Sequence, residues 1–444
     1  MTKDAHSFIK KSILHTNSYH VPETEKFWFS LDNAAKIFPA IINKEVTSVF
    51  RLSAVLNRPI QIEPLRKAVL RAENRFPYYK VQLRKGFFWY YLEHMPRHIP
   101  VEVDDQPCCR MFRTGHLLIR ILVWNNRLSI ECSHILADGG GAFEFLKTLL
   151  ILYSKACGKT IPPEHDVKQE DIQISEEEYE DAYKRYFRED VPPMVKRSKA
   201  FHLPYPLKPS PRFQRLTAIL PMKQLRSVAS GKEVSITVYL TSVYLYVLQE
   251  LYESQGALNK LRSNKILRVQ VPINLRNIFP SRTMRNFSLF VMPEIDLRLG
   301  HYTFEEIIKT VYHQVQLETD KKLINKNISR NVGSERKIYV RSIPLFLKSW
   351  ILRMKYYALG TSQYSGVVTN VGRIHLPPET EGMVSHFIVV PPPPNKMLKV
   401  NCGIVGFKDK VVMSFGNVTI SDDFESRFLR FLRDQDISVE IEKS

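Results

Sequence analysis

The chain has 444 residues, of which 44% are hydrophobic and 25% are charged. This composition is typical of a folded protein and excludes a disordered chain, a collagen and a short disulfide scaffold, while the length favours two packed lobes. Lysine and arginine number 64 against 45 acidic residues, a net charge of +19, which favours anionic partners without choosing among nucleic acid, membrane, acidic carrier protein or phosphorylated cofactor; a basic surface that only aids solubility is equally compatible.

The cysteines predict neither a disulfide framework nor a metal site. There are five of them, without Cys-x-x-Cys spacing and without histidine partners at metal-ligand intervals. The first 20 residues contain no continuous apolar segment, and no run of 18 apolar residues occurs anywhere. We therefore expect a cytoplasmic protein with reduced thiols, no bound metal and no integral membrane segment. The cysteines are Cys108, Cys109, Cys132, Cys157 and Cys402.

The first half of the chain predicts a helix, a β-hairpin and a second helix. Apolar residues recur at helical spacing from Leu65 to Phe76, until Pro77 interrupts them. Two apolar runs, 117–124 and 127–134, flank an Asn-Asn pair, which indicates a hairpin. The apolar segment 142–157 then predicts a long helix.

Residues 162–193 differ from their surroundings. An acidic run, 176–181, lies between paired prolines at each end of this segment, in a chain that is otherwise basic. The segment is either a connection between lobes or a solvated acidic helix. We place the boundary between an N-terminal lobe, 1–190, and a C-terminal lobe, 191–444, within it.

The second half again alternates helices and strands, which predicts an α/β protein. Residues 235–254 are typical of a buried helix capped by Ser235 or Thr237, and 266–276 of a strand. Two further runs, 398–407 and 411–418, face each other across a short turn. The aromatic and basic stretch 349–360 could stack nucleic-acid bases or lie on a membrane, but its spacing of Trp350, Met354 and Tyr357 favours a face packed on the core.

The segment most indicative of chemistry is RLSIECSHILADGGG, residues 127–141, between a strand and a helix. In a strand, alternate residues share a face, so His134 should point inward with the preceding apolar side chains. A histidine at such a strand end is shielded from bulk water yet reachable through a cleft, so it can stay neutral and accept a proton near pH 7. Its fourth neighbour, Asp138, could orient it directly or hold the loop by pairing with an arginine, and the glycines 139–141 should let that loop bend through backbone angles closed to other residues.

With these residues the chain resembles the chloramphenicol-acetyltransferase-like superfamily of acyltransferases, which includes the condensation domains of nonribosomal peptide synthesis. The resemblance covers nearly the whole chain and is strongest to stand-alone alcohol O-acetyltransferase-like proteins. It is carried by the His-x-x-x-Asp-Gly segment, 134–139, by LDNAAKIFP, 31–39, and by NLRNIFPS, 274–281. It implies a mixed α/β (α+β) fold of two similar lobes, each a mixed sheet with helices, arranged in a V around a tunnel.

The resemblance also implies roles for individual residues. His134 is expected to be the general base, Asp138 to be structural and paired with Arg276, and Gly139 to let the substrate approach closely. Thr369 or Asn370, in a segment that resembles the strand crossing between lobes, could donate to the oxyanion of the tetrahedral intermediate.

The activity implied is transfer of an acyl group from a thioester to a hydroxyl or amine of a small acceptor. The donor expected is acyl-CoA, such as acetyl-CoA, acting as co-substrate without a bound cofactor, and O-acylation is favoured. A condensation-type enzyme that uses an acidic acyl carrier protein is the alternative, and a catalytically silent binding protein of the same fold is a third. No nucleic-acid partner is expected, because the chain has no recognisable nucleic-acid motif.

Overall fold

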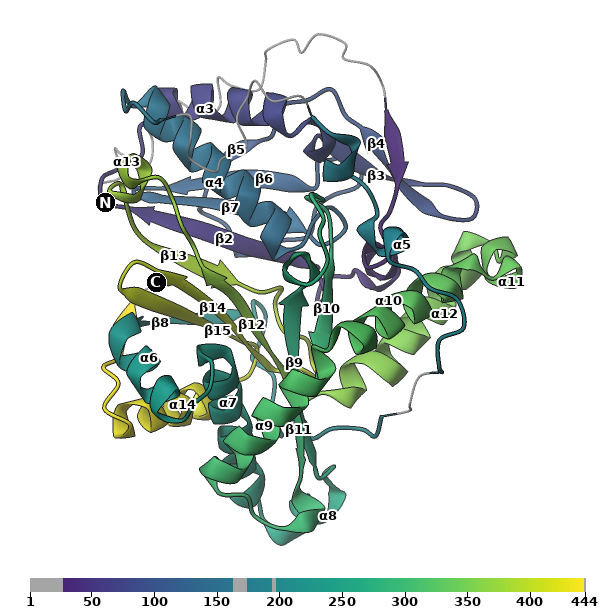
Figure 1. Cartoon of the computed structure of the whole chain (residues 1–444), viewed down its shortest axis with the longest axis vertical. Coiled ribbons are helices and arrows are strands. Elements are labelled where there is room, and N and C mark those ends of the chain that lie inside the picture. Colours follow the sequence, from purple (N-terminus) through teal and green to yellow (C-terminus); the bar gives the residue numbers. More distant parts are fainter. Residues whose placement is uncertain (1–26, 163–173, 194–196, 443–444) are drawn as a thin grey trace.

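The computed structural model describes residues 27–162, 174–193 and 197–442. The N-terminal segment inspected for a leader, and residues 163–173 of the predicted connection, lie outside this part of the chain. Helices and strands alternate along the described residues and form the predicted α/β architecture (Figure 1). Among them no single helix is long and apolar enough to cross a membrane; only the pair Met222–Gly231 and Ile236–Glu253, bent by 81°, meets the length and composition criteria together.

The first lobe is built on a five-stranded sheet of order β13-β2-β7-β6-β5, against which two long helices pack (Figure 1). Its hairpin turns at Asn125, whose φ of 52° explains the Asn-Asn signal of the sequence. A small sheet of order β1-β4-β3 lies beside it. The elements are β1 (Trp28–Ser30), β2 (Val49–Leu56), α3 (Ile62–Arg75), β3 (Val81–Lys85), β4 (Tyr90–His94), β5 (Val101–Val103), β6 (Ile119–Trp124), β7 (Arg127–Ser133), α4 (Gly139–Ala156) and β13 (Val384–Val390).

The second lobe is built on an eight-stranded sheet of order β10-β9-β12-β14-β15-β8-β16, with β11 paired to β9. The buried helix predicted at 235–254 is α7, and the Ser235 hydroxyl caps it by accepting a hydrogen bond from Val238 N. The elements are β8 (Gln214–Pro221), α6 (Met222–Gly231), α7 (Ile236–Glu253), α8 (Ala257–Arg262), β9 (Ile266–Asn274), β10 (Ser288–Val291), β11 (Glu294–Asp296), α9 (Phe304–Glu318), β12 (Gly366–Arg373), β14 (Val400–Phe407), β15 (Lys410–Asn417), α14 (Asp423–Asp434) and β16 (Glu440–Glu442).

The second half of the chain contributes one strand to the sheet of the first lobe. β13 comes late in the chain, yet it pairs antiparallel with β2 of the first lobe, with Phe387 opposite Ala54. The core of the first lobe also includes Val405, Phe407 and Val412 from β14 and β15. Figure 1 shows β13 beside β2 at the edge of the first sheet, on the side that faces β14 and β15 of the second lobe. The lobes therefore share apolar contacts in addition to a chain connection.

The acidic run between the lobes is neither a free linker nor a fully solvated helix. Residues 176–178 form a short 3-10 helix, and Glu178 is buried. Its carboxylate accepts hydrogen bonds from Arg75 Nη2 at 2.7 Å and from the Tyr78 hydroxyl at 2.7 Å. Its carbonyl accepts from Met284 N at 2.7 Å, so this segment is fastened to residues of both lobes.

An arm of three helices extends from the second lobe, on the right of Figure 1. The expectation that Trp350 and Met354 face the core is wrong, because their side chains are 59% and 53% exposed. The apolar face of a helix is set by periodicity, but whether another element covers that face is not. The arm consists of α10 (Lys321–Arg336), α11 (Ile338–Ser342) and α12 (Leu345–Lys355), and the remaining short helices are α2 (Phe38–Ile41), α5 (Ala182–Arg185) and α13 (Pro378–Glu381).

Candidate active site

A cavity of about 1360 Å³ is lined by residues of both lobes. Phe38, Phe50 and His134 line it from the first lobe, and Thr369 and Val371 of β12 from the second. Most of its lining is apolar. Ligand sites in proteins are commonly such apolar cavities with a few convergent polar groups, and they often lie where two domains meet. We therefore take this cavity as the candidate active site.

His134 is held at the wall of this cavity. It is the first residue after β7, and its backbone N–H donates to Ser48 O at 2.9 Å, which continues the pairing of β7 with β2 by one residue. Its imidazole lies between two aromatic rings, with centroids 5.4 Å from Phe38 and 4.5 Å from Phe50. The residue is partly exposed, and it lines the cavity.

This environment keeps His134 neutral. Burial lowers the pKa of its imidazole below 6.5, because an apolar surrounding disfavours the charged form. The charge of Asp138 and hydrogen bonds to the Ala137 backbone and to Asn286 act in the opposite direction without overcoming burial. A neutral imidazole facing a cavity can accept a proton from a bound molecule at pH 7.

Asp138 holds the backbone around the site. Its Oδ1 accepts from Gly141 N at 2.9 Å and caps α4. Its Oδ2 accepts from Arg276 Nη1 at 2.9 Å and from Phe287 N at 2.8 Å. The described residues show no hydrogen bond between this carboxylate and His134. The sequence leaves two roles open for Asp138, orienting His134 directly or holding the loop by pairing with an arginine. Its contacts correspond to the second role.

Arg276 links the two lobes at this point. Its guanidinium donates from Nη1 to Asp138 and to Asn274 Oδ1, at 2.9 and 3.1 Å. It also donates from Nε to Thr283 O at 2.8 Å and from Nη2 to Arg285 O at 2.5 Å. A guanidinium so fully hydrogen-bonded is fixed in direction, and it fixes the start of α4 against the second lobe.

The three glycines after Asp138 do not have the unusual backbone angles that the sequence predicts. None of Gly139 to Gly141 has positive φ, so the prediction that they bend the loop through unusual backbone angles is wrong. Close packing explains Gly141, because a Cβ there would lie 1.9 Å from Met284 O. At Gly139 the nearest atom to an added Cβ is Val371 Cγ1 at 3.6 Å, an ordinary contact. Gly139 lines the cavity, so a side chain there would project toward a bound molecule.

The two candidate oxyanion donors both line the cavity, but their side chains are engaged differently. Asn370 Nδ2 donates to Thr237 Oγ1 at 2.9 Å, and its Oδ1 accepts from Gly372 N at 2.9 Å. The Thr369 hydroxyl has no hydrogen bond to any residue in the described part of the chain. Thr369 is therefore the freer donor of the two.

The sequence does not predict a polar network that contacts the backbone of His134. Asn286 Nδ2 donates both to His134 O, at 2.9 Å, and to Asp32 Oδ2, at 3.0 Å. Asp32 Oδ1 accepts from Ala35 N at 2.8 Å, and burial raises the pKa of this carboxyl to about 6. The LDNAAKIFP segment thus supplies both this network and Phe38, which stacks on the imidazole. This segment is part of the resemblance to the superfamily, but nothing in its sequence links it to Asn286.

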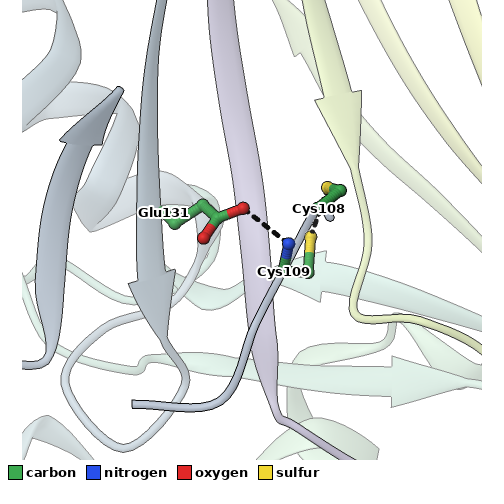
Figure 2. Close-up of side chains that lie close together, drawn as sticks. All are labelled: Cys108, Cys109 and Glu131. Carbon is green, nitrogen blue, oxygen red and sulfur yellow. Dashed lines mark hydrogen bonds between the residues drawn. The ribbon is translucent and has the colours of Figure 1, made fainter. Parts of the chain in front are cut away.

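A second polar cluster lies away from the cavity, where Cys108, Cys109 and Glu131 have ligand atoms within 4.8 Å of one another (Figure 2). All five cysteines are free thiols, and the sulfurs of Cys108 and Cys109 are 2.8 Å apart. The Glu131 carboxylate already accepts hydrogen bonds from Cys109 N, Arg51 and Arg120. Two guanidiniums on the one carboxylate would repel a cation, so these residues are a poor metal site.

Comparisons with known proteins give structural matches only. No protein-family model matches the sequence, and neither does any curated protein sequence. The TRI3 trichothecene 15-O-acetyltransferase from Fusarium sporotrichioides superposes with a TM-score of 0.57 at 10% identity, covering 92% of this chain and 94% of that one. TRI101 from F. sporotrichioides, complexed with coenzyme A and T-2, gives 0.58 at 11% identity, with 94% and 99% covered.

The first condensation domain of the calcium-dependent antibiotic synthetase gives a TM-score of 0.58 at 13% identity, and 93% of this chain and 99% of that domain are covered. Matches over almost the full length of both partners mean that the arrangement of the two lobes is shared, as well as the individual sheets. The chain therefore has the two-lobed fold common to these acetyltransferases and condensation domains, as the resemblance of its sequence predicts.

Proposed function

We propose that the chain is an acyltransferase that moves an acyl group from acyl-CoA to a hydroxyl or amine of a small acceptor, with a hydroxyl favoured. The observation that carries this proposal is a neutral His134 facing a cavity between the lobes. The matches support it, because they include two acetyltransferases, one of them in complex with coenzyme A.

In the proposed reaction His134 removes the proton from the acceptor as the acceptor oxygen or nitrogen attacks the thioester carbonyl. The tetrahedral oxyanion accepts a hydrogen bond from Thr369, with Asn370 as the second candidate. When the intermediate collapses, the carbon–sulfur bond breaks and the imidazolium returns the proton to the leaving thiolate. No covalent acyl-enzyme is formed, so donor and acceptor must occupy the cavity together.

The remaining site residues keep the base in place. Asp138 and Arg276 hold the start of α4 and the second lobe together behind the imidazole. Asn286 holds the His134 carbonyl, and Phe38 and Phe50 restrict rotation of the ring. Enzymes gain rate by holding reacting groups in geometry that is productive before the reaction begins.

The charge of the cavity supports a phosphorylated donor. Lys147 lines the cavity but is paired with Glu144, whereas Lys355 and Arg373 line it without an ion pair to any described residue, so their cationic groups can contact the phosphates of CoA. A cytoplasmic location is part of the proposal, and the five free thiols support it.

The test is release of free thiol from acetyl-CoA and longer acyl-CoAs, each with a panel of alcohols and amines. We expect release that requires donor and acceptor together, and a matching acylated product by mass spectrometry. Release with a carrier-bound acyl thioester alone would assign the enzyme to the condensation-type alternative. No release above the blank with any donor would contradict acyl transfer.

A further inference from the structure

The arm helix α12 is apolar on two faces. Its inner face includes Leu345, which is buried, and Leu352, which lines the cavity. Its outer face carries Phe346, Leu347, Trp350 and Met354, a spacing of one, three and four residues that places them in a single stripe. A helix in a globular protein ordinarily exposes a polar face on the side away from the core. Packing within the described part of the chain therefore does not explain the outer stripe of α12.

The exposed apolar surface continues onto neighbouring elements. Ile338 and Tyr339 of α11 are exposed, and so are Phe87 and Phe88 at the tip of the β3–β4 hairpin. Leu345 N donates to Phe87 O at 3.0 Å, so the hairpin tip is fastened to the first residue of α12. We define the outer patch as the exposed apolar residues of α11 and α12, which are between 41% and 80% exposed: Ile338, Tyr339, Phe346, Leu347, Trp350 and Met354.

The segment that carries the outer patch is strongly basic. Residues 321–360 contain ten lysines and arginines and one acidic residue, Glu335, so 10 − 1 = +9 of the net charge of +19 lies in these 40 residues. Glu335 itself pairs with Lys36 of the first lobe. Lys337 and Arg341 are exposed beside the outer patch. The excess of positive charge is thus concentrated in this segment, although most of the lysines and arginines lie elsewhere in the chain.

Exposed apolar side chains of this size mark a surface that contacts another molecule. Aromatic and aliphatic side chains combined with lysine and arginine on one helical surface are the combination that binds the interface of an anionic bilayer. Lys348 is buried and Lys355 lines the cavity, so these two cations are not counted toward the docking surface. The exposed cations that remain on the arm complement anionic headgroups, and they extend from the start of α10 to α12, which fits an extended charged surface better than a compact partner: Lys321, Lys322, Arg336, Lys337, Arg341 and Arg353.

We propose that α11, α12 and the adjoining tip of the β3–β4 hairpin form a docking surface for a bilayer of anionic phospholipids. In the docked state the outer patch lies among the headgroups and upper acyl chains, and Lys337 and Arg341 contact the phosphates. Because the inner face of α12 lines the cavity, docking places that wall of the cavity next to the bilayer.

The experiment measures partitioning of the full-length chain onto phosphatidylcholine vesicles with and without phosphatidylserine, by sedimentation. We expect binding that requires phosphatidylserine and weakens as salt rises, because counterions screen the attraction. F346S/W350S should lower partitioning roughly tenfold or more, since two large apolar side chains are lost. K337Q/R341Q should lower it about fivefold for each charge removed.

Matched controls come from the opposite end of the second lobe. L258S/L261S removes two leucines of α8 that are 72% and 77% exposed, and K309Q/R433Q removes two exposed charges. Both controls should bind vesicles as the unaltered chain does, and so should H134A, which separates docking from acyl transfer. Circular dichroism establishes that each variant is folded, and the single variants W350S and K337Q replace any double variant that is not.

Equal binding by the patch variants and the unaltered chain would overturn the proposal, as would binding that ignores phosphatidylserine. Patch-dependent binding to an acidic acyl carrier protein, with no vesicle binding, would also overturn it and would assign the surface to a protein partner.

Discussion

The imidazole of His134 lies between Phe38 and Phe50, and this placement has a consequence for pH dependence. Burial lowers its pKa below 6.5, so the neutral base persists to lower pH than a solvated histidine would allow. We predict that kcat/KM for acyl transfer falls with a slope of one on the acid side, with a midpoint below pH 6.5. A pH series at low substrate concentration measures it.

Asp32 titrates close to this range, since burial raises its pKa to about 6. Substitution D32N removes that titration and keeps an oxygen that can accept from Ala35 N. If the fall of kcat/KM on the acid side reports His134, its midpoint should stay at the same pH in D32N. If this fall disappears in D32N, it reports the Asp32 carboxyl instead.

Alanine variants of Gly141 and Gly139 test whether close packing requires glycine at position 141. G141A forces a Cβ to within 1.9 Å of Met284 O, and moving the backbone that far should cost about 3 kcal/mol of unfolding free energy or more. G139A meets only an ordinary contact and gains helix propensity, so its stability should change by no more than about 1 kcal/mol. Chemical denaturation compares the two, and equal stability of both variants would contradict the packing argument.

The sequence predicts those site residues that are close to one another along the chain. His134, Asp138 and the glycines form one contiguous segment between a strand and a helix, so pattern and resemblance locate them. The hydrogen bonds of Asn286 to His134 and Asp32 connect residues more than 150 positions apart, and no local pattern signals such a contact. The reason for the glycines was also mistaken, because steric crowding from Met284 depends on tertiary structure.

At the level of elements, the start of α4 is fixed by an ion pair between the lobes. Asp138 and Arg276 are both mostly buried, so removing one leaves the other charged without its partner. We predict that D138N and R276A each lower the unfolding free energy by about 3 kcal/mol and reduce acyl transfer. Denaturation and kinetics measure both effects.

The double variant D138N/R276A is the decisive comparison. Its loss should be smaller than the sum of the single losses by at least about 1 kcal/mol, because the same interaction is removed twice. Additive losses would show that the two residues contribute independently. The resemblance to the acyltransferase superfamily predicts this pair, whereas spacing along the chain does not.

The arm shows the limit of periodicity. Apolar spacing in 349–360 predicts a helix with an apolar face, and the structure has α12 up to Lys355, followed by a π-helical turn at Tyr356–Gly360. Periodicity does not tell which side of a helix is covered, and here apolar residues occupy both sides. The error at Trp350 therefore lies in the assignment of burial and not in the secondary structure.

In the whole molecule, the pairing of β13 with β2 holds the two lobes together. Without β13, the backbone groups of β2 on that side lose their partners, and an unpaired strand edge favours aggregation. The lobe boundary near residue 190 stays a prediction. A fragment that ends there, 1–190, lacks β13. We predict that this fragment aggregates or unfolds on its own, as judged by size-exclusion chromatography and circular dichroism.

The intact chain is the control for that fragment and should unfold in one transition, because the lobes share β13, the ion pair of Arg276 and part of the first core. A soluble, monomeric and cooperatively folded fragment would show that β13 is dispensable for the first lobe.

In the proposed reaction, His134 serves as the base for acyl transfer in the cavity between the lobes. The most direct measurement compares thiol release by H134A and the unaltered chain with the same acyl-CoA and acceptor, together with the affinity of each for the donor. We predict a rate lower by ~10² to 10⁴ with unchanged donor affinity and an unchanged melting temperature. Turnover by folded H134A at a rate near that of the unaltered chain would contradict the claim.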